Sequence, residues 1–267
     1  MFLNRNTYAK KQLSEYFPVL LFVLMTIVLL GILSSCNAAK TAGISEVSPS
    51  EDKAPQVSPE KKAEPMEVVI VIDAGHGGED WGTYYGSVKE KNINLSIALR
   101  LGPLLKKHGI RIAYTREKDE FIGLRERAEL ANTLNAALFI SIHNNRMPGN
   151  PKYKGTETLY AAAANHRFDT MTDKKLARII QNELVDKLKT YDNGIIYRPE
   201  LAVLRRTSMP AVIAEIGYIS NSSDREKLST ETFRQKTAEA LEAAVLKALE
   251  EMGAGKDASG KWMVLGK

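Results

Sequence analysis

The feature that most constrains the fold of this chain is an alternation between short apolar runs and longer segments with helical spacing. The apolar runs have the length and β-branched content of buried strands. Strands are predicted at EVVIVID (67–73), IRIAYT (110–115), AALFISIH (136–143), GTETLY (155–160) and AVIAEIG (211–217). Because such strands alternate with helices, we expect a single α/β domain with a mostly parallel central sheet and helices on both faces.

The segments between these strands carry the helical pattern. Helices are predicted within residues 93–109, 124–134, 174–189 and 234–253. Pro103 falls late in the first of them and is expected to end or kink it, because proline removes a backbone donor. Ser223 and Glu226 have the spacing of a capping box that opens a further short helix.

The N-terminal segment, residues 1–36, predicts export. A basic start precedes the uncharged run 17–33, and Leu33-Ser34-Ser35-Cys36 resembles the lipobox of bacterial lipoproteins, in which the cysteine is lipidated. Seventeen apolar residues barely span a bilayer, which favours a lipoprotein signal over an uncleaved signal anchor. Either alternative predicts a membrane-anchored protein with the rest of the chain outside the cytoplasm.

Composition predicts the extent of the folded domain and excludes two properties of the chain. Residues 37–66 contain four prolines, mixed charges and few apolar groups, and predict a disordered tether. The folded domain is expected over 67–253, and 254–267 are expected to be a flexible tail. Cys36 is the single cysteine, so no disulfide can form within the chain. The net charge of +5 comes without a Lys/Arg cluster, and nucleic-acid binding is therefore not expected.

Two histidines stand directly after predicted strands. His76 follows the first strand across a short turn, and His143 ends the strand 136–143. The carboxyl ends of parallel strands meet at one edge of a sheet, where binding sites form. Two imidazoles at that edge can share a metal. A catalytic zinc takes three protein ligands and keeps one position open, so one further ligand is needed, and a carboxylate is the expected type.

Several carboxylates compete for this role. The candidates are Asp73, Glu79, Asp80, Glu90, Glu157 and Glu215. Glu90 opens a helix, where a negative charge is favoured. Glu215 interrupts an apolar strand, where a carboxylate is costly unless it is paired or bound. Near a metal it would have a raised pKa, which suits a general base. Taken singly, each residue also has a structural interpretation, as a helix first-turn residue or an ion-pair partner.

Glu79 is the nearest alternative partner, because His76-Gly-Gly-Glu79 has the His-x-x-Glu spacing of one kind of zinc peptidase. Glycines give no rigid helix face to fix such a pair, whereas Glu90 has a better physical setting at the start of a helix. Gly75, Gly77 and Gly78 are interpreted as the permissive turn that lets His76 reach a metal. Asp80 is a candidate for holding this loop.

At this point the sequence resembles a known family, the zinc-dependent N-acetylmuramoyl-L-alanine amidases of the amidase-3 type. The resemblance covers residues 67–252 and rests on an ordered set of motifs. These are IDAGHGGEDWG, KEKNINLSIALRL, YTRE, LRERAELAN, LFISIHNN, GTETLY and LAVLRRTSMPAVIAEIGYISN, followed by the last helix. It implies a zinc amidase domain over 67–253, one Zn²⁺ held by His76, Glu90 and His143, and catalysis by Glu215.

The resemblance also implies the reaction, hydrolysis of the amide between the lactyl group of N-acetylmuramic acid and L-alanine in peptidoglycan. Asn145 and Arg116 are possible substrate-orienting or ligand-supporting residues. Some family members carry a long insertion that blocks the zinc, whereas only residues 161–172 follow the strand 155–160 here. We therefore expect an open site and no obligate activator. The Gly102-Pro103 pair departs from the family pattern and leaves the packing of its helix open.

Two other functions are kept as alternatives. A zinc carboxypeptidase acting on stem peptides would use His76, Glu79 and His143. A lipid-anchored wall-binding protein without activity would need no catalytic residue, and the complete set of His76, Glu90, His143 and Glu215 argues against it.

Overall fold

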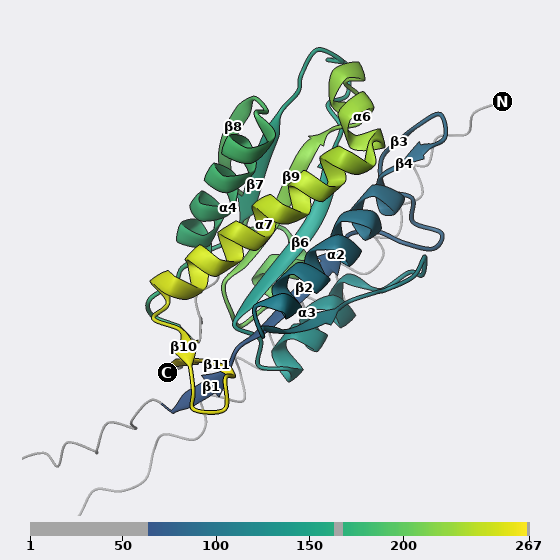
Figure 1. Cartoon of the computed structure of the whole chain (residues 1–267). Coiled ribbons are helices and arrows are strands. Elements are labelled where there is room, and N and C mark those ends of the chain that lie inside the picture. Colours follow the sequence, from purple (N-terminus) through teal and green to yellow (C-terminus); the bar gives the residue numbers. More distant parts are fainter. Residues whose placement is uncertain (1–63, 163–167, 266–267) are drawn as a thin grey trace, which may run out of the picture. The chain divides into compact units, whose positions relative to one another are not determined.

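The computed structural model describes residues 64–162 and 168–265. A six-stranded sheet forms the centre of this part of the chain (Figure 1). In spatial order its strands are β5 (Arg111–Tyr114), β2 (Val69–Ala74), β6 (Leu138–Asn145), β9 (Ala211–Tyr218), β7 (Thr156–Tyr160) and β8 (Asp192–Tyr197). Only the β7–β9 pair is antiparallel. The predicted mostly parallel sheet is therefore confirmed. The signal segment and almost all of the tether lie outside the described residues.

Helices cover both faces of the sheet. On one face, α7 (Glu231–Glu251) packs between α2 (Glu90–Lys107) and α4 (Asp173–Leu188), as Figure 1 shows. On the other face, α3 (Leu124–Thr133) packs against the short α5 (Ala202–Arg205). The predicted single α/β domain is confirmed. Among the described residues, no helix is both long and apolar enough to cross a bilayer.

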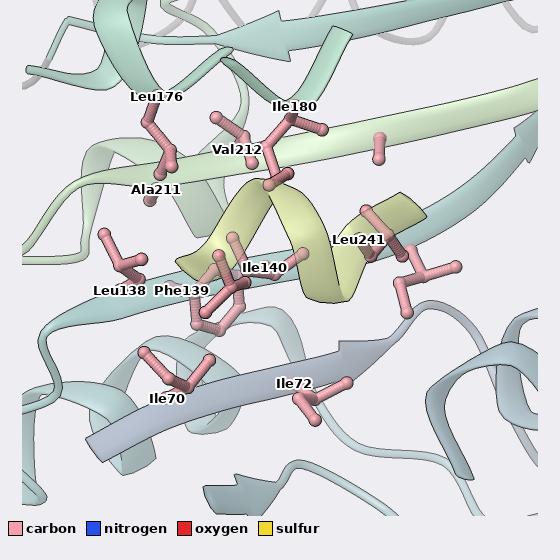
Figure 2. Close-up of a cluster of buried hydrophobic side chains, with 14 of the residues drawn as sticks. Ile70, Ile72, Leu138, Phe139, Ile140, Leu176, Ile180, Ala211, Val212 and Leu241 are labelled. Atoms are coloured by element: carbon pink, nitrogen blue, oxygen red, sulfur yellow. The ribbon is translucent and has the colours of Figure 1, made fainter. Parts of the chain in front are cut away.

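The core explains why the strands read as continuous apolar runs. Every residue of β2 is buried, because helices lie above and below it. Figure 2 shows part of this core. Strand register places Ile72 of β2, Ile140 of β6 and Val212 of β9 in one row across the sheet. Burying each such side chain stabilises the fold by about 1.5–3 kcal/mol.

Strand register brings three polar residues into one row. His143 of β6 pairs with Glu215 of β9, and Glu215 pairs with Glu157 of β7. Paired residues on neighbouring strands point to the same face of a sheet. Since β7 runs antiparallel to β9, its first residues lie beside the last residues of β9. The row therefore crosses the sheet at the edge where β2, β6 and β9 end.

Pro103 was expected to end or kink its helix, and the structure corrects the first of these two alternatives. Helix α2 continues through Pro103 to Lys107. Its buried face packs on the sheet and on α7, which compensates for the missing backbone donor. Gly102 has its own packing reason, because a Cβ there would lie 1.7 Å from Oη of Tyr114. Gly102 therefore lets the helix approach β5 closely.

The expected flexible tail is also corrected. Two strands, β10 (Gly255–Lys256) and β11 (Trp262–Leu265), form a three-stranded antiparallel sheet with β1 (Pro65–Glu67). Val264 is buried there. The pairing joins segments almost 200 residues apart, so local composition could not reveal it. It also places the last residues of the predicted tether in a strand.

Two smaller features differ from the sequence predictions. Strand β8 was not predicted, because Asn193 and Gly194 interrupt its apolar pattern. The short helix α6 (Ser222–Ser229) is capped by Asn221, whose side chain accepts hydrogen bonds from the backbone of Ser223 and Asp224. The predicted Ser223 capping box is therefore wrong by two positions.

Candidate metal centre

Three side chains form the one group among the described residues with the geometry of a metal site. One ligand atom from each of His76, Glu90 and His143 lies within 4.8 Å of the other two. Oε1 of Glu90 is 3.3 Å from Nε2 of His76 and 2.9 Å from Nδ1 of His143. Two imidazoles and one carboxylate are a donor set of catalytic zinc sites, and the chemistry of the cluster therefore fits zinc. Glu79 is exposed and outside this group.

The turn after β2 places His76 at the sheet edge. His76 has a left-handed backbone conformation with φ 61°, and Gly77 and Gly78 also have positive φ. Gly75 has a different role, because a Cβ there would lie 2.1 Å from Nε2 of His143. The glycines therefore allow both the reversal of the chain and the close approach of the two imidazoles.

Asp80 orients the imidazole of His76. Its Oδ2 is 2.7 Å from Nδ1 of His76, which leaves Nε2 for the metal position. Its Oδ1 accepts a hydrogen bond from the backbone N–H of Gly82. Burial lowers the pKa of His76, but the contacts with Glu90 and Asp80 outweigh this effect and raise it above the ordinary value. A carboxylate behind a histidine ligand is a common supporting arrangement in metal sites.

Glu90 begins helix α2 and is only 3% exposed. The backbone N–H of Thr83 donates to Oε2 over 2.8 Å, and that of Asn144 donates to Oε1 over 3.0 Å. Burial alone would raise the pKa of Glu90, but hydrogen bonds and charges from His143 and His76 lower it far below its ordinary value. The carboxylate is therefore held ionised, as a metal ligand requires.

Glu215 lies beside this cluster, but its hydrogen bonding and its pKa differ from those of Glu90. It is in register with His143, and its buried Oε2 has no hydrogen-bond partner in the part of the chain that the structure describes. Burial, followed by the negative charges of Glu90 and Glu157, raises its pKa well above the ordinary value. A buried carboxylate oxygen without a partner is costly, and a catalytic role is one of the explanations for such a group in a native structure.

The supporting residues predicted from the sequence have unequal roles. Arg116 is 2% exposed and donates to backbone carbonyls of Ala74, Gly75 and Lys91, so it holds the histidine turn in place. Asn145 donates from Nδ2 to Oε1 of Glu157, at the end of the row described above.

Sequence reasoning missed a buried ion pair beneath the turn. Nη1 of Arg127 is 2.7 Å from Oδ1 of Asp73, and Arg127 also donates to the carbonyls of Ala74 and His76. Burial would raise the pKa of Asp73, but Arg127 and the hydroxyl of Ser141 hold it below its ordinary value. The sequence signal that could have revealed this pair was Arg127, which lies next to Ala128 of the apolar face in the predicted helix 124–134.

A cavity of about 370 Å³ adjoins the cluster. His76 and His143 line one part of it. Asp73, Gly75, Asp80 and Arg127 also line it. The rest of the wall is apolar and comes from the loop before α3, the start of α3, the α5 region and β9: Phe121, Ile122, Leu124, Leu201, Ala202, Val203 and Ile213. The candidate metal centre is therefore open to a ligand from the face of the sheet that carries α3 and α5.

Comparison with known proteins gives a consistent match. A family model described as N-acetylmuramoyl-L-alanine amidase matches residues 70–247. The uncharacterised protein YqiI of Bacillus subtilis is 39% identical over 180 residues, which are 67% of this chain and 84% of that protein. The structure of N-acetylmuramoyl-L-alanine amidase from Clostridium difficile 630 has a TM-score of 0.64 at 34% identity, covering 69% of this chain and 97% of that chain.

A further solved structure is the CwlD amidase from Clostridioides difficile in complex with the GerS lipoprotein. Its TM-score is 0.63 at 31% identity, and the similarity covers 69% of this chain and 99% of that chain. Both structures therefore match the described domain over nearly their whole length.

Proposed function

The chain belongs to the N-acetylmuramoyl-L-alanine amidase family, and we propose that the cluster of His76, Glu90 and His143 holds one zinc ion for the reaction. Members of this family hydrolyse the amide between N-acetylmuramic acid and L-alanine in peptidoglycan. The observation that carries the proposal is the juxtaposition of this donor set with Glu215, whose buried Oε2 has no hydrogen-bond partner among the described residues. When bound, zinc would supply the Lewis acid that activates water and polarises the scissile carbonyl.

The protein residues have separate tasks in this proposal. Glu215 accepts the proton of the attacking water at its free Oε2 and returns it to the leaving amine of alanine. A raised pKa suits both steps, because it makes the carboxylate a stronger acceptor for the proton of water than an ordinary glutamate is. Asp80 keeps Nε2 of His76 directed at the metal position.

The first prediction tests the role of Glu215. Glu215→Gln has nearly the same shape but cannot accept the proton. We expect it to bind zinc as the wild type does and to lose hydrolysis of purified peptidoglycan by roughly 10²–10⁴-fold. Zinc is measured by elemental analysis, and product is measured by mass spectrometry. His143→Ala is the matched control that should lose the metal. Activity retained by Glu215→Gln would refute the role.

The same digest separates the reaction from the peptidase alternative. An amidase releases peptides with a new L-alanine amino terminus, whereas a carboxypeptidase releases an amino acid and leaves new peptide carboxyl ends. Nothing in the described cluster favours the second reaction, because Glu79 lies outside it.

We also propose that the protein is held at the membrane by residues 1–36, with Cys36 lipidated, so that the domain faces the cell wall. The apolar run 17–33 and the lipobox-like Leu33–Cys36 support this. We propose in addition that no activator is obligatory, because only twelve residues connect Tyr160 to Asp173. Labelling with a palmitate analogue in wild type and Cys36→Ala tests whether Cys36 is lipidated. Running the peptidoglycan assay without any added protein tests whether an activator is obligatory.

A further inference from the structure

Three aromatic side chains gather on the segment that joins the first two proposed metal ligands. Trp81 is 43% exposed, and Tyr84 and Tyr85 are 53% and 58% exposed. The two tyrosines form strand β3 (Tyr84–Tyr85), which pairs with β4 (Val88–Lys89) in a hairpin. The rings of Trp81 and Tyr84 meet edge to face with their centroids 5.7 Å apart. We call Trp81, Tyr84 and Tyr85 the aromatic hairpin. Exposed apolar clusters of this kind mark interaction surfaces.

Hydrogen bonds attach the aromatic hairpin firmly to the metal centre. Thr83 donates its backbone N–H to Oε2 of Glu90, and Glu90 donates its own N–H back to the carbonyl of Thr83. The backbone N–H of Lys91 donates to the carbonyl of Trp81. At Gly82 the chain passes so near the ligands that a Cβ would lie 2.4 Å from Oε2 of Glu90. The hairpin is therefore a fixed rim of the site.

Two cations hold the rings in place. Nζ of Lys89 lies 3.5 Å from the centroid of the Trp81 ring, and the guanidinium of Arg225 lies 3.8 Å from that of Tyr85. Arg225 belongs to helix α6, so its contact with Tyr85 joins the hairpin to that helix. Its guanidinium is itself held by a hydrogen bond to the carbonyl of Ile219. Each cation covers part of one ring, and the exposed fractions leave the rest open to solvent. Ordered rings bind at a low entropic cost.

We propose that the aromatic hairpin binds the glycan strand of peptidoglycan beside the muramoyl residue whose amide is cleaved. The inference rests on the proposed function, because the lactyl group ties the scissile amide directly to a sugar ring. That ring must therefore lie close to the metal position. Pyranose faces and N-acetyl methyl groups present polarised C–H bonds, which pack against the negative faces of aromatic rings. A wall polyanion fits less well, since Lys89 and Arg225 are already placed over rings.

The binding test uses the full-length protein in mild detergent and a peptide-free oligosaccharide of alternating N-acetylglucosamine and N-acetylmuramic acid. Trp81 and Trp262 are the only tryptophans of the chain, so in Trp262→Phe the tryptophan fluorescence reports on Trp81 alone. We expect a saturable fluorescence change that persists in Trp262→Phe. In Tyr85→Ala the affinity should fall roughly three- to tenfold. Tyr85→Phe, which keeps the ring, should restore it.

Tyr197→Ala is the matched control. Tyr197 is also 53% exposed, but it ends the edge strand β8. This variant should bind the oligosaccharide as the wild type does. In digests of intact sacculi, Trp81→Ala and Tyr85→Ala should raise KM with wild-type zinc content, and Trp81→Phe should recover most of the loss.

Two results would overturn the inference. One is the absence of any fluorescence response to the peptide-free glycan, including the case in which only free stem peptide or an anionic wall polymer gives a response. The other is an equal loss of affinity in Tyr197→Ala and Tyr85→Ala. Because this assay needs no hydrolysis, failed binding by an active enzyme rejects the glycan surface alone. Glycan binding without any amide hydrolysis would instead reject the proposed function.

Discussion

At the scale of single residues, three carboxylates near one sheet edge are held in different states by their surroundings. Asp73 is ionised and forms an ion pair with the buried guanidinium of Arg127, and Glu90 is ionised between two imidazoles. Glu215 has an oxygen without any partner in the described structure. The same functional group therefore serves as a structural ion, a proposed metal ligand and a proposed base. Local charge and hydrogen bonding determine which of these roles each carboxylate has.

The raised pKa of Glu215 predicts a pH-dependent stability of the metal-free protein. A carboxyl group whose pKa is higher in the folded state stabilises the fold below its unfolded pKa, and this stability is lost as the pH rises through the folded pKa. Glu215→Gln cannot ionise and escapes that loss. With a chelator present, the Tm of Glu215→Gln should match that of the wild type near pH 4 and exceed it increasingly toward neutral pH. A constant Tm difference across this range would contradict the assignment.

The ion pair beneath the histidine turn makes a second residue-level prediction. Arg127→Ala leaves the buried carboxylate of Asp73 without its countercharge and should cost about 3–5 kcal/mol in the free energy of unfolding. Arg125 is its matched control, since it lies two residues away and pairs with Glu129 at the surface. Arg125→Ala should leave the unfolding midpoint nearly unchanged. Urea denaturation of both variants measures the difference, and equal midpoints would show that the buried pair has no special importance.

At the scale of elements, the site depends on the segment between β2 and α2. Its glycines do two different things: some adopt positive φ, and some leave room for a ligand side chain. Gly82 does both, because its φ is +64° and a Cβ would meet Glu90 and His76. Gly86 in the hairpin turn has a similar φ of +57°, but a Cβ there would meet no other atom within 4 Å.

The comparison of Gly82 with Gly86 separates the backbone strain of an alanine at positive φ from the steric conflict of its Cβ with the proposed ligands. Gly82→Ala should weaken zinc binding by roughly 10- to 100-fold, because it displaces two proposed ligands. Gly86→Ala carries similar backbone strain and should keep wild-type zinc affinity. Competition with a chromogenic chelator gives both constants. If the two substitutions weaken zinc binding equally, strain and not the contact with Glu90 and His76 is responsible.

At the scale of the whole molecule, the ends of the described domain are joined by the sheet of β1, β11 and β10. Trp262 connects this sheet to the rest of the domain, because its Nε1 donates to the carbonyl of His108 and its own carbonyl accepts from Val68. The metal centre is built from other elements, β2, α2 and β6. Folding stability and metal binding are therefore expected to be separable.

Trp262→Ala tests that separation. Loss of the partly buried ring and its hydrogen bond should cost about 1–3 kcal/mol in the free energy of unfolding, with unchanged zinc content. Leu265→Ala, in the same strand but with its side chain 62% exposed, should change the free energy of unfolding by less than about 0.5 kcal/mol. A loss of zinc in Trp262→Ala at a temperature where the protein is folded would contradict the prediction.

The sequence alone was sufficient for the fold class, because burial on both faces makes parallel strands continuously apolar and leaves a helical period between them. It also pointed to the edge of the sheet where His76 and His143 lie, since strand direction places the residues that follow each strand. Glu215 was evident for a related reason, as a charge inside an apolar strand.

Only the tertiary structure decided what depends on pairing between distant segments. The ion pair of Asp73 with Arg127 and the terminal sheet both require knowledge of which elements meet. The continuation of α2 through Pro103 has the same origin, because packing on the sheet outweighs a local helix-breaking preference. Glu90 was already favoured over Glu79 from the sequence, and the structure adds its short distances to both histidines. Local patterns encode the period and burial of an element, whereas contacts between elements depend on the packing of the whole domain.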